Sequence, residues 1–191
     1  GSGDITWHAI IDKVLATGKP ILLATGASTM EDVVEAVKRI EQSTSQFAIM
    51  QCNTNYTGSN DNFRHVNLEV INKFKSTFPN ATLGLSDHTN GHVAVLGAIC
   101  FGARVIEKHF TDDNNRKGPD HSFALNSSDW QSMVLDARIL EETLGDGIKR
   151  IETNEIETAI LQRRSIRVKR KIEKGETLDE TMLVCLRPCP A

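Results

Sequence analysis

The sequence of 191 residues lacks a long hydrophobic run, a marked excess of one charge and an N-terminal targeting pattern. No stretch approaches the roughly 18 consecutive apolar residues of a membrane helix, and no basic segment followed by an apolar one opens the chain. The formal net charge of −3 argues against nucleic acid as the main partner. With 39% hydrophobic residues, the composition is that of a globular protein, and we expect neither a membrane nor a nucleic acid among its partners.

Cysteine is also scarce and follows no disulfide or zinc pattern. Cys52 and Cys100 lie in apolar runs that predict burial, and Cys185 and Cys189 have no second pair that would complete a zinc site. The basic run from Arg163 to Lys171 alternates with apolar residues, which favours a solvated strand face over a nucleic-acid contact. Free thiols suit a reducing compartment, so we expect a cytoplasmic protein.

What the sequence does contain is a regular alternation of helical and strand-like patterns. Four short apolar runs predict buried strands at residues 20–25, 47–52, 82–86 and 104–110. Helical periodicity predicts helices at residues 6–15, 28–40, 67–78 and 91–103, and a long helix from Asn126 to Gly145. Ser28 and Glu31 have the spacing of a capping box at the start of the second helix, and Gly18 is placed to end the first.

This order predicts an α/β fold of four parallel αβ units and a final helix, residues 1–147. A TIM barrel has eight such units in about 250 residues, so the chain corresponds to about half of one. Residues 1–4 read as the tail of a strand, although Gly1-Ser2 could instead be an expression scar; we favour native sequence. Residues 148–163 are expected to be a linker, with a charged linker or a helix over residues 151–162. Residues 164–191 are expected to begin a small β-rich domain that the chain does not finish, with a strand at 165–168, a turn at 173–176 and a short turn or helix at 177–183.

Two histidines end two of the predicted strands. His88 follows the third strand and His109 lies in the fourth, and the segment between them is a helix in pattern. A strand–helix–strand unit of this length places both imidazoles at the carboxyl edge of adjacent parallel strands, where α/β proteins bind ligands. Two neutral imidazoles there can hold a divalent metal and leave positions open for substrate oxygens. The alternative is that the two histidines are unrelated, with one capping a helix and the other packed in the core.

Several motifs, in their order and spacing, resemble the sialic acid synthase family: GSGDITW, the TG of LLATGAS, CNTNY, GLSDHT, VIEKHF, GPDHSFAL and RRSIRVKRKIEKGETL. The resemblance covers essentially the whole chain. It implies a TIM barrel followed by an antifreeze-like (SAF) domain, of which this chain supplies the end of strand four, strands five to eight and the start of the SAF domain. A catalytic glutamate and a phosphate-binding lysine would then precede Gly1.

The resemblance also implies an activity and its partners. Family enzymes condense phosphoenolpyruvate with an N-acylated mannosamine-type sugar to make a nine-carbon nonulosonic acid and release phosphate. They use a divalent metal, manganese above all, with magnesium or cobalt as alternatives. The resemblance further implies a homodimer in which each SAF domain covers the partner's barrel mouth.

Individual residues match family positions. His88 and His109 match manganese ligands, and Ser2 and Ser86 match serines that bind phosphate and carboxylate. Asp120 matches an aspartate that contacts the sugar hydroxyls near the metal, and it is the catalytic candidate of this chain. A turn residue after Pro119 is the alternative for Asp120.

Tyr56 matches a tyrosine that lines the sugar site, and Thr54 stands where serine or asparagine is usual. Ala24 departs from the family, which usually has a substrate-holding serine there. The segment from Gln51 to Gly58 resembles legionaminic acid synthases more than typical sialic acid synthases. This favours a 2,4-diacetamido-6-deoxy-mannose substrate over N-acetylmannosamine.

Two other functions stay open. A different metal-dependent barrel enzyme, such as an aldolase, would need a Schiff-base lysine in an apolar strand, and the only candidate there, Lys108, lies between Glu107 and His109, where an ion pair is favoured. A non-catalytic fragment or binding module is the second alternative. Without the missing half of the barrel, we expect this chain alone to be inactive.

Overall fold

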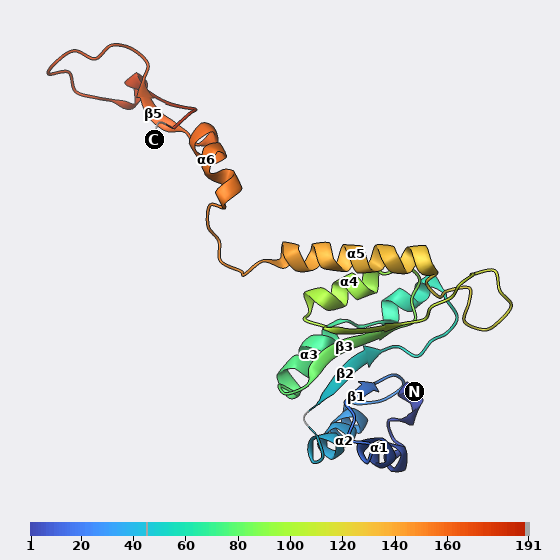
Figure 1. The fold of residues 1–191 in the computed structure, drawn as a ribbon. Coiled ribbons are helices and arrows are strands. Elements are labelled where there is room, and N and C mark those ends of the chain that lie inside the picture. Colours follow the sequence, from blue (N-terminus) through green and yellow to red (C-terminus); the bar gives the residue numbers. More distant parts are fainter. Residues whose placement is uncertain (45, 190–191) are drawn as a thin grey trace. The chain divides into compact units, whose positions relative to one another are not determined.

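The computed structural model describes residues 1–44 and 46–189, and these form two compact units, Gly1–Gly145 and the segment from Asp146 onward. The first unit is built on a curled parallel sheet of four strands: β1 (Ile21–Ala24), β2 (Phe47–Cys52), β3 (Thr82–Asp87) and β4 (Val105–Lys108). The strands lie in the order β1-β2-β3-β4 (Figure 1). This is the half-barrel that the alternating pattern predicted.

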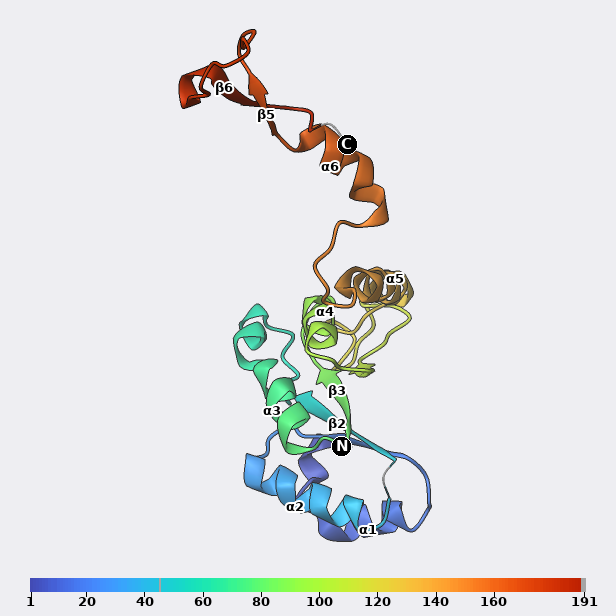
Figure 2. The ribbon, with the colours of Figure 1, turned by 90° about the vertical axis from the view of Figure 1, so that its left-hand side faces the viewer.

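Five helices belong to the same unit: α1 (His8–Leu15), α2 (Met30–Glu41), α3 (Glu69–Thr77), α4 (Val93–Cys100) and α5 (Ser127–Leu144). Figure 2 shows α2, α3 and α4 in succession around the outside of the curved sheet. Apolar side chains spaced by three or four residues, such as Val33, Val37 and Ile40 of α2, bury the helices against it. No helix of the described residues is both long and apolar enough to cross a membrane.

Alternation along each strand separates an outer face from an inner face. Ile49 and Leu85 point outward into the helix-covered core and are at most 1% exposed. Leu22 points the other way, to the concave side, and is 61% exposed. The register pairs Cys52 with Ser86, which places polar side chains of neighbouring strands together near the carboxyl edge of the sheet.

Three local predictions are wrong. The cap of α2 is Thr29, whose hydroxyl accepts from the Asp32 amide while the Asp32 carboxylate accepts from the Thr29 amide. Ser28 is not the cap, because its hydroxyl donates to the Thr25 carbonyl at 2.6 Å. Residues 2–4 form a 3-10 helix and not the tail of a strand. Cys100, which was expected to be buried, is exposed. In addition, the 3-10 helix at Asn60–His65 was not predicted.

The second unit contains a 3-10 helix (Thr153–Glu155), α6 (Ile156–Gln162) and a two-stranded antiparallel sheet of β5 (Ser165–Val168) and β6 (Leu183–Leu186). The strand expected at residues 165–168 is present. The short helix expected within 177–183 is the 3-10 helix Glu180–Met182, and β6, which follows it, was not predicted.

Candidate active site

The two histidines lie side by side just beyond the last paired residues of β3 and β4. The register pairs Asp87 with Lys108, so His88 and His109 occupy matching positions one residue later. Their ring centroids are 5.1 Å apart, and His88 is 7% exposed. This is the placement that the strand–helix–strand spacing predicted.

The surroundings of His88 fix its tautomer. Its Nδ1 lies 3.0 Å from the carbonyl oxygen of Asn53, and a carbonyl can only accept, so Nδ1 carries the hydrogen. In the neutral ring, the Nε2 atom then carries the lone pair. A histidine held in this way by a backbone carbonyl has the arrangement typical of metal ligands.

His109 lies between a second imidazole and a carboxylate. Its Nδ1 is 3.6 Å from a carboxylate oxygen of Asp120. Burial lowers the pKa of His109 below its ordinary value, and the neighbouring His88 lowers it further, while Asp120 and Glu107 oppose both effects. The imidazole of His109 is therefore neutral at neutral pH and able to donate a lone pair.

An aromatic wall holds both imidazoles. The ring of Tyr56 packs edge-on against both imidazoles, with ring centroids 4.5 Å from that of His88 and 5.6 Å from that of His109. The ring centroid of Phe123 lies 5.2 Å from that of His109. Burial is the largest effect that raises the pKa of Tyr56, followed by the charges of Cys52, Asp120 and Glu107. The phenol therefore keeps its proton at neutral pH and remains a hydrogen-bond donor beside the two rings.

A group of hydroxyls lies next to the histidines. The hydroxyls of Ser2 and Thr54 are 3.0 Å apart, within hydrogen-bonding distance, and Thr54 also lies 3.7 Å from the thiol of Cys52. Gly26 packs directly against this group, because a Cβ atom at this position would lie 1.7 Å from the Thr54 hydroxyl. Ser86 is 5% exposed, and its strand neighbour Cys52 belongs to the same group.

One cavity of about 330 Å³ joins many of these side chains. Ser2, Tyr56, Ser86, His88 and His109 all line it, together with apolar residues of α1 and β1. Asp120 and Thr54 do not line it, although each contacts a residue that does. The structure thus brings all the candidate residues of the sequence into one neighbourhood.

Asp120 comes from the irregular segment between β4 and α5. This segment is braced from within, because the Asn114 side chain donates to the carbonyls of His121 and Ala124 at 2.9 and 2.8 Å. The Thr111 hydroxyl lies 2.8 Å from the Nδ1 atom of His121. Together with the Ala124 amide, which donates to the Asp120 carbonyl at 3.2 Å, these contacts hold the backbone that follows Asp120.

Comparison with known proteins matches residues 1–149 to the NeuB family. The chain belongs to the NeuB family. Over 188 residues it is 39% identical to an uncharacterized protein of Methanocaldococcus jannaschii, and this match covers 98% of this chain and 55% of that protein. It is 33% identical over 190 residues to the N,N'-diacetyllegionaminic acid synthase of Campylobacter jejuni, and this match covers 98% of this chain and 56% of the synthase.

A crystal structure of N-acetylneuraminic acid (sialic acid) synthetase from Leptospira borgpetersenii, in complex with citrate, superposes with a TM-score of 0.74 at 26% identity. The match covers 82% of this chain and 54% of the synthetase. The chain therefore spans about half the length of the relatives that it matches.

The sequence interpretation of this NeuB chain missed one residue of the site. Glu107 lines the cavity with His109, and the register pairs it with Ser86. The signal was present, since Glu107 precedes His109 by two positions and therefore lies on the same face of the strand.

The donor set fits a divalent metal only in part. His88 and His109 present two imidazoles at adjacent strand ends, and the tautomer of His88 is held in the form that a metal needs. Among residues 1–44 and 46–189, no group of three or more histidine, cysteine or acidic side chains forms a closed metal site. This chain can therefore supply two nitrogen ligands, and the other positions would fall to water, substrate or groups outside it.

Proposed function

We propose that this chain forms the carboxyl-terminal half of the active site of a nonulosonic acid synthase. The reaction is the condensation of phosphoenolpyruvate with an N-acylated amino-hexose, with release of phosphate. The observation that carries the proposal is the shared cavity, in which two imidazoles, one tyrosine and two serines meet at the carboxyl edge of the half-barrel. Membership of the NeuB family supports it.

The chemistry makes one carbon–carbon bond and replaces one carbon–oxygen bond by another. Carbon three of phosphoenolpyruvate bonds to the aldehyde carbon of the open-chain sugar, and the aldehyde oxygen takes up a proton to become a hydroxyl. Water adds its oxygen to carbon two, the carbon–oxygen bond to phosphate breaks, and carbon two becomes a carbonyl. The two protons of water balance those taken up by the aldehyde oxygen and by the leaving phosphate. A divalent cation, manganese with magnesium or cobalt as alternatives, would polarise the aldehyde when bound. His88 and His109 are the residues of this chain that would hold it.

The other side chains have binding and positioning roles in this proposal. Ser2 and Ser86 would donate to phosphate and carboxylate oxygens, with Thr54 beside Ser2. Asp120 lies next to His109, where its carboxylate would accept from sugar hydroxyls and orient the aldehyde; it is the catalytic candidate. Tyr56 would form the wall of the sugar site against both imidazoles.

The complete site requires groups that these residues do not supply. A catalytic glutamate and a phosphate-binding lysine would come from the front half of the barrel. The second unit of this chain would begin an SAF domain, and in a homodimer that domain would cover the partner's barrel mouth. Cytoplasmic synthesis fits a reaction that consumes phosphoenolpyruvate.

A 6-deoxy diacetamido-mannose is our proposed sugar. The segment from Gln51 to Gly58 carries this preference, and it contributes Tyr56 and Thr54 to the site. Similarity to a legionaminic acid synthase supports the choice, although similarity to a sialic acid synthetase also exists.

The aldolase alternative loses its candidate lysine. The ammonium of Lys108 lies 2.7 Å from a carboxylate oxygen of Asp87, and both side chains are 1% exposed. A Schiff-base lysine needs an unpaired amine that faces the substrate. Lys108 is committed to an ion pair and does not line the main cavity.

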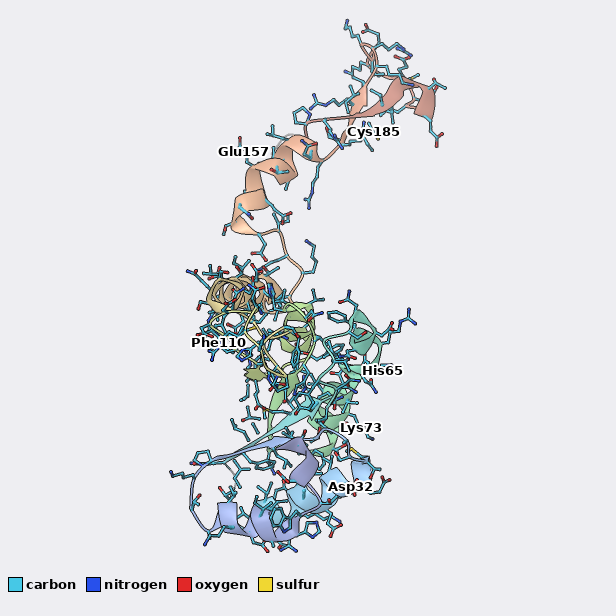
Figure 3. The ribbon with its side chains drawn as sticks, turned by 90° about the vertical axis from the view of Figure 1, so that its right-hand side faces the viewer. Asp32, His65, Lys73, Phe110, Glu157 and Cys185 are labelled. Atoms are coloured by element: carbon cyan, nitrogen blue, oxygen red, sulfur yellow. The ribbon has the colours of Figure 1, made fainter. Side chains whose placement is uncertain are left out.

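The test measures phosphate release from phosphoenolpyruvate by the full protein encoded by the natural gene, with and without sugar and Mn²⁺. His88→Ala or His109→Ala should abolish manganese binding and lower the rate by several orders of magnitude. His65→Ala is the control, because His65 is exposed and lies well away from Phe110, the neighbour of His109 (Figure 3). Unchanged manganese content by elemental analysis in both histidine variants would refute the metal assignment. Phosphate release that does not depend on the sugar would refute the proposed synthase reaction.

A further inference from the structure

A buried ion pair lies directly behind the two histidines. Lys108 and Asp87 immediately precede His109 and His88, and the register pairs them across β3 and β4. Since side chains alternate along a strand, the ion pair lies on the opposite face of the sheet from the imidazoles. Both charged side chains are 1% exposed, so the pair is almost wholly removed from water.

The pair is also tied to the residue on the other side of His88. The Asp87 carboxylate accepts from the amide and from the hydroxyl of Thr89, each at 3.0 Å. The Lys108 ammonium donates to the Thr89 carbonyl. Thr89 is 2% exposed, so these hydrogen bonds are also shielded from water. His88 is therefore held at both neighbouring positions, and one of the holding groups belongs to the strand that carries His109.

This arrangement continues the connection between the strands past the end of their regular pairing. The ladder between β3 and β4 ends at Asp87 and Lys108, and both histidines lie one residue beyond it. The ring of His88 is held by the Asn53 carbonyl and the backbone of His109 by the Leu125 amide, but neither of these contacts joins the two histidines to each other, which takes a further link between their strands. The ammonium of Lys108, bonded to both Asp87 and Thr89, provides that link.

We propose that the Asp87–Lys108 ion pair, together with Thr89, positions the imidazoles of His88 and His109 relative to each other. The two charged residues are positioning residues, because neither lines the main cavity; a smaller cavity at the strand ends is lined by both of them and by both histidines, but their charged groups are paired with each other there and are 1% exposed. In its consequence for metal binding, the proposal rests on the metal site of the proposed function. Loss of groups that orient metal ligands typically lowers metal affinity by about 10- to 100-fold, and we expect a loss in that range.

The experiment uses the full natural protein and two variants. Lys108→Met leaves a buried carboxylate without a partner and risks unfolding the protein. The double variant Asp87→Leu with Lys108→Met removes both charges, and apolar replacement of a buried pair is often neutral or stabilising. The control is Arg39→Met, which removes the exposed ion pair of Arg39 with Asp12 between α2 and α1.

Two measurements are made on each protein. Electron paramagnetic resonance titration gives the affinity for Mn²⁺, which should fall about 10- to 100-fold in the double variant and stay unchanged in Arg39→Met. In metal-free protein, NMR of labelled histidine and tyrosine rings reports the contact between Tyr56 and His88, whose centroids are 4.5 Å apart. That cross-relaxation should weaken in the double variant.

Each outcome decides the proposal. A folded double variant with unchanged manganese affinity and an unchanged ring contact overturns it, and so does an equal loss of affinity in Arg39→Met. If His88→Ala leaves the affinity for Mn²⁺ unchanged, the metal assignment itself has failed. The ring contact in metal-free protein then decides alone: its loss in the double variant supports the positioning role, and its persistence refutes it.

Discussion

Replacing Gly26 by alanine tests the packing beneath the hydroxyl group of the site. The added Cβ would lie 1.7 Å from the Thr54 hydroxyl, 2.8 Å from the Ser2 hydroxyl and 2.9 Å from the Cys52 sulfur, whereas ordinary contacts begin at 3.4 Å. The Thr54 hydroxyl must therefore move by more than an ångström, which breaks its 3.0 Å contact with Ser2. Overpacking of this kind costs about 1–3 kcal/mol of stability, and the lost hydrogen bond adds roughly 1 kcal/mol.

Function should fall together with stability. If Ser2 donates to a phosphate or carboxylate oxygen, its displacement removes a charge-assisted hydrogen bond of about 1.5–3 kcal/mol, or about 10- to 100-fold in kcat/KM for phosphoenolpyruvate. Urea unfolding and steady-state kinetics on the full natural protein measure the two effects.

The matched control for this change is Gly3→Ala, since a Cβ at Gly3 meets nothing within 4 Å. A second variant adds Thr54→Ala to Gly26→Ala, which removes the closest clashing atom, so the pair should cost less than the sum of the two single changes. The reasoning fails if Gly26→Ala and Gly3→Ala unfold within about 0.5 kcal/mol of each other and share one KM.

Three further outcomes are expected. In metal-free protein, NMR should show that the pKa of the His109 imidazole lies below its ordinary value of 6.5, because burial and the charge of His88 both disfavour the protonated form. The variant His88→Ala should raise that pKa. A pKa above 6.5 in the unaltered protein would contradict the burial argument. In direct competition, the 6-deoxy diacetamido sugar should show the higher kcat/KM, and a preference for N-acetylmannosamine would refute the legionaminic choice alone. The isolated 191-residue chain should release no phosphate. It should also associate in sedimentation, because within residues 1–44 and 46–189 β1 and β4 each have one unpaired edge and Leu22 is 61% exposed on the concave side; a compact monomer would argue against this.

The sequence predicted the half-barrel because its periodicities are strong. Runs such as residues 47–52 are fully buried in the structure, and the helical stripe of Val33, Val37 and Ile40 packs as expected. The positions of His88 and His109 followed from the same regularity, since parallel strands joined by a helix end at one edge.

The failures occur where local hydrogen bonds compete with pattern. Ser28 and Thr29 both satisfy the requirements of a cap, and only the contact of Ser28 with the Thr25 carbonyl decides between them. Strand β6 pairs with β5 across a long connection, and no local signal marks a partner so far along the chain. The pairing of Asp87 with Lys108 depends on the register of β3 and β4, which residue spacing alone does not set.

The proposed metal ligands and the proposed sugar-binding carboxylate are carried by different kinds of structure. His88 and His109 follow paired strands, whereas Asp120 lies in an irregular segment held by side-chain hydrogen bonds such as those of Asn114 and by single backbone bonds such as that from the Ala124 amide to the Asp120 carbonyl. Substitutions in residues 112–122 are therefore expected to redirect Asp120 without disturbing the strands, since this range leaves out Phe123, which packs on His109, and Leu125, whose amide donates to the His109 carbonyl. Exchanging this segment with that of a relative should change the preferred sugar while the affinity for Mn²⁺ stays the same, and a parallel loss of both would show that the two are coupled. Under the proposed function, such a division would let the preferred sugar change while the metal ligands are kept.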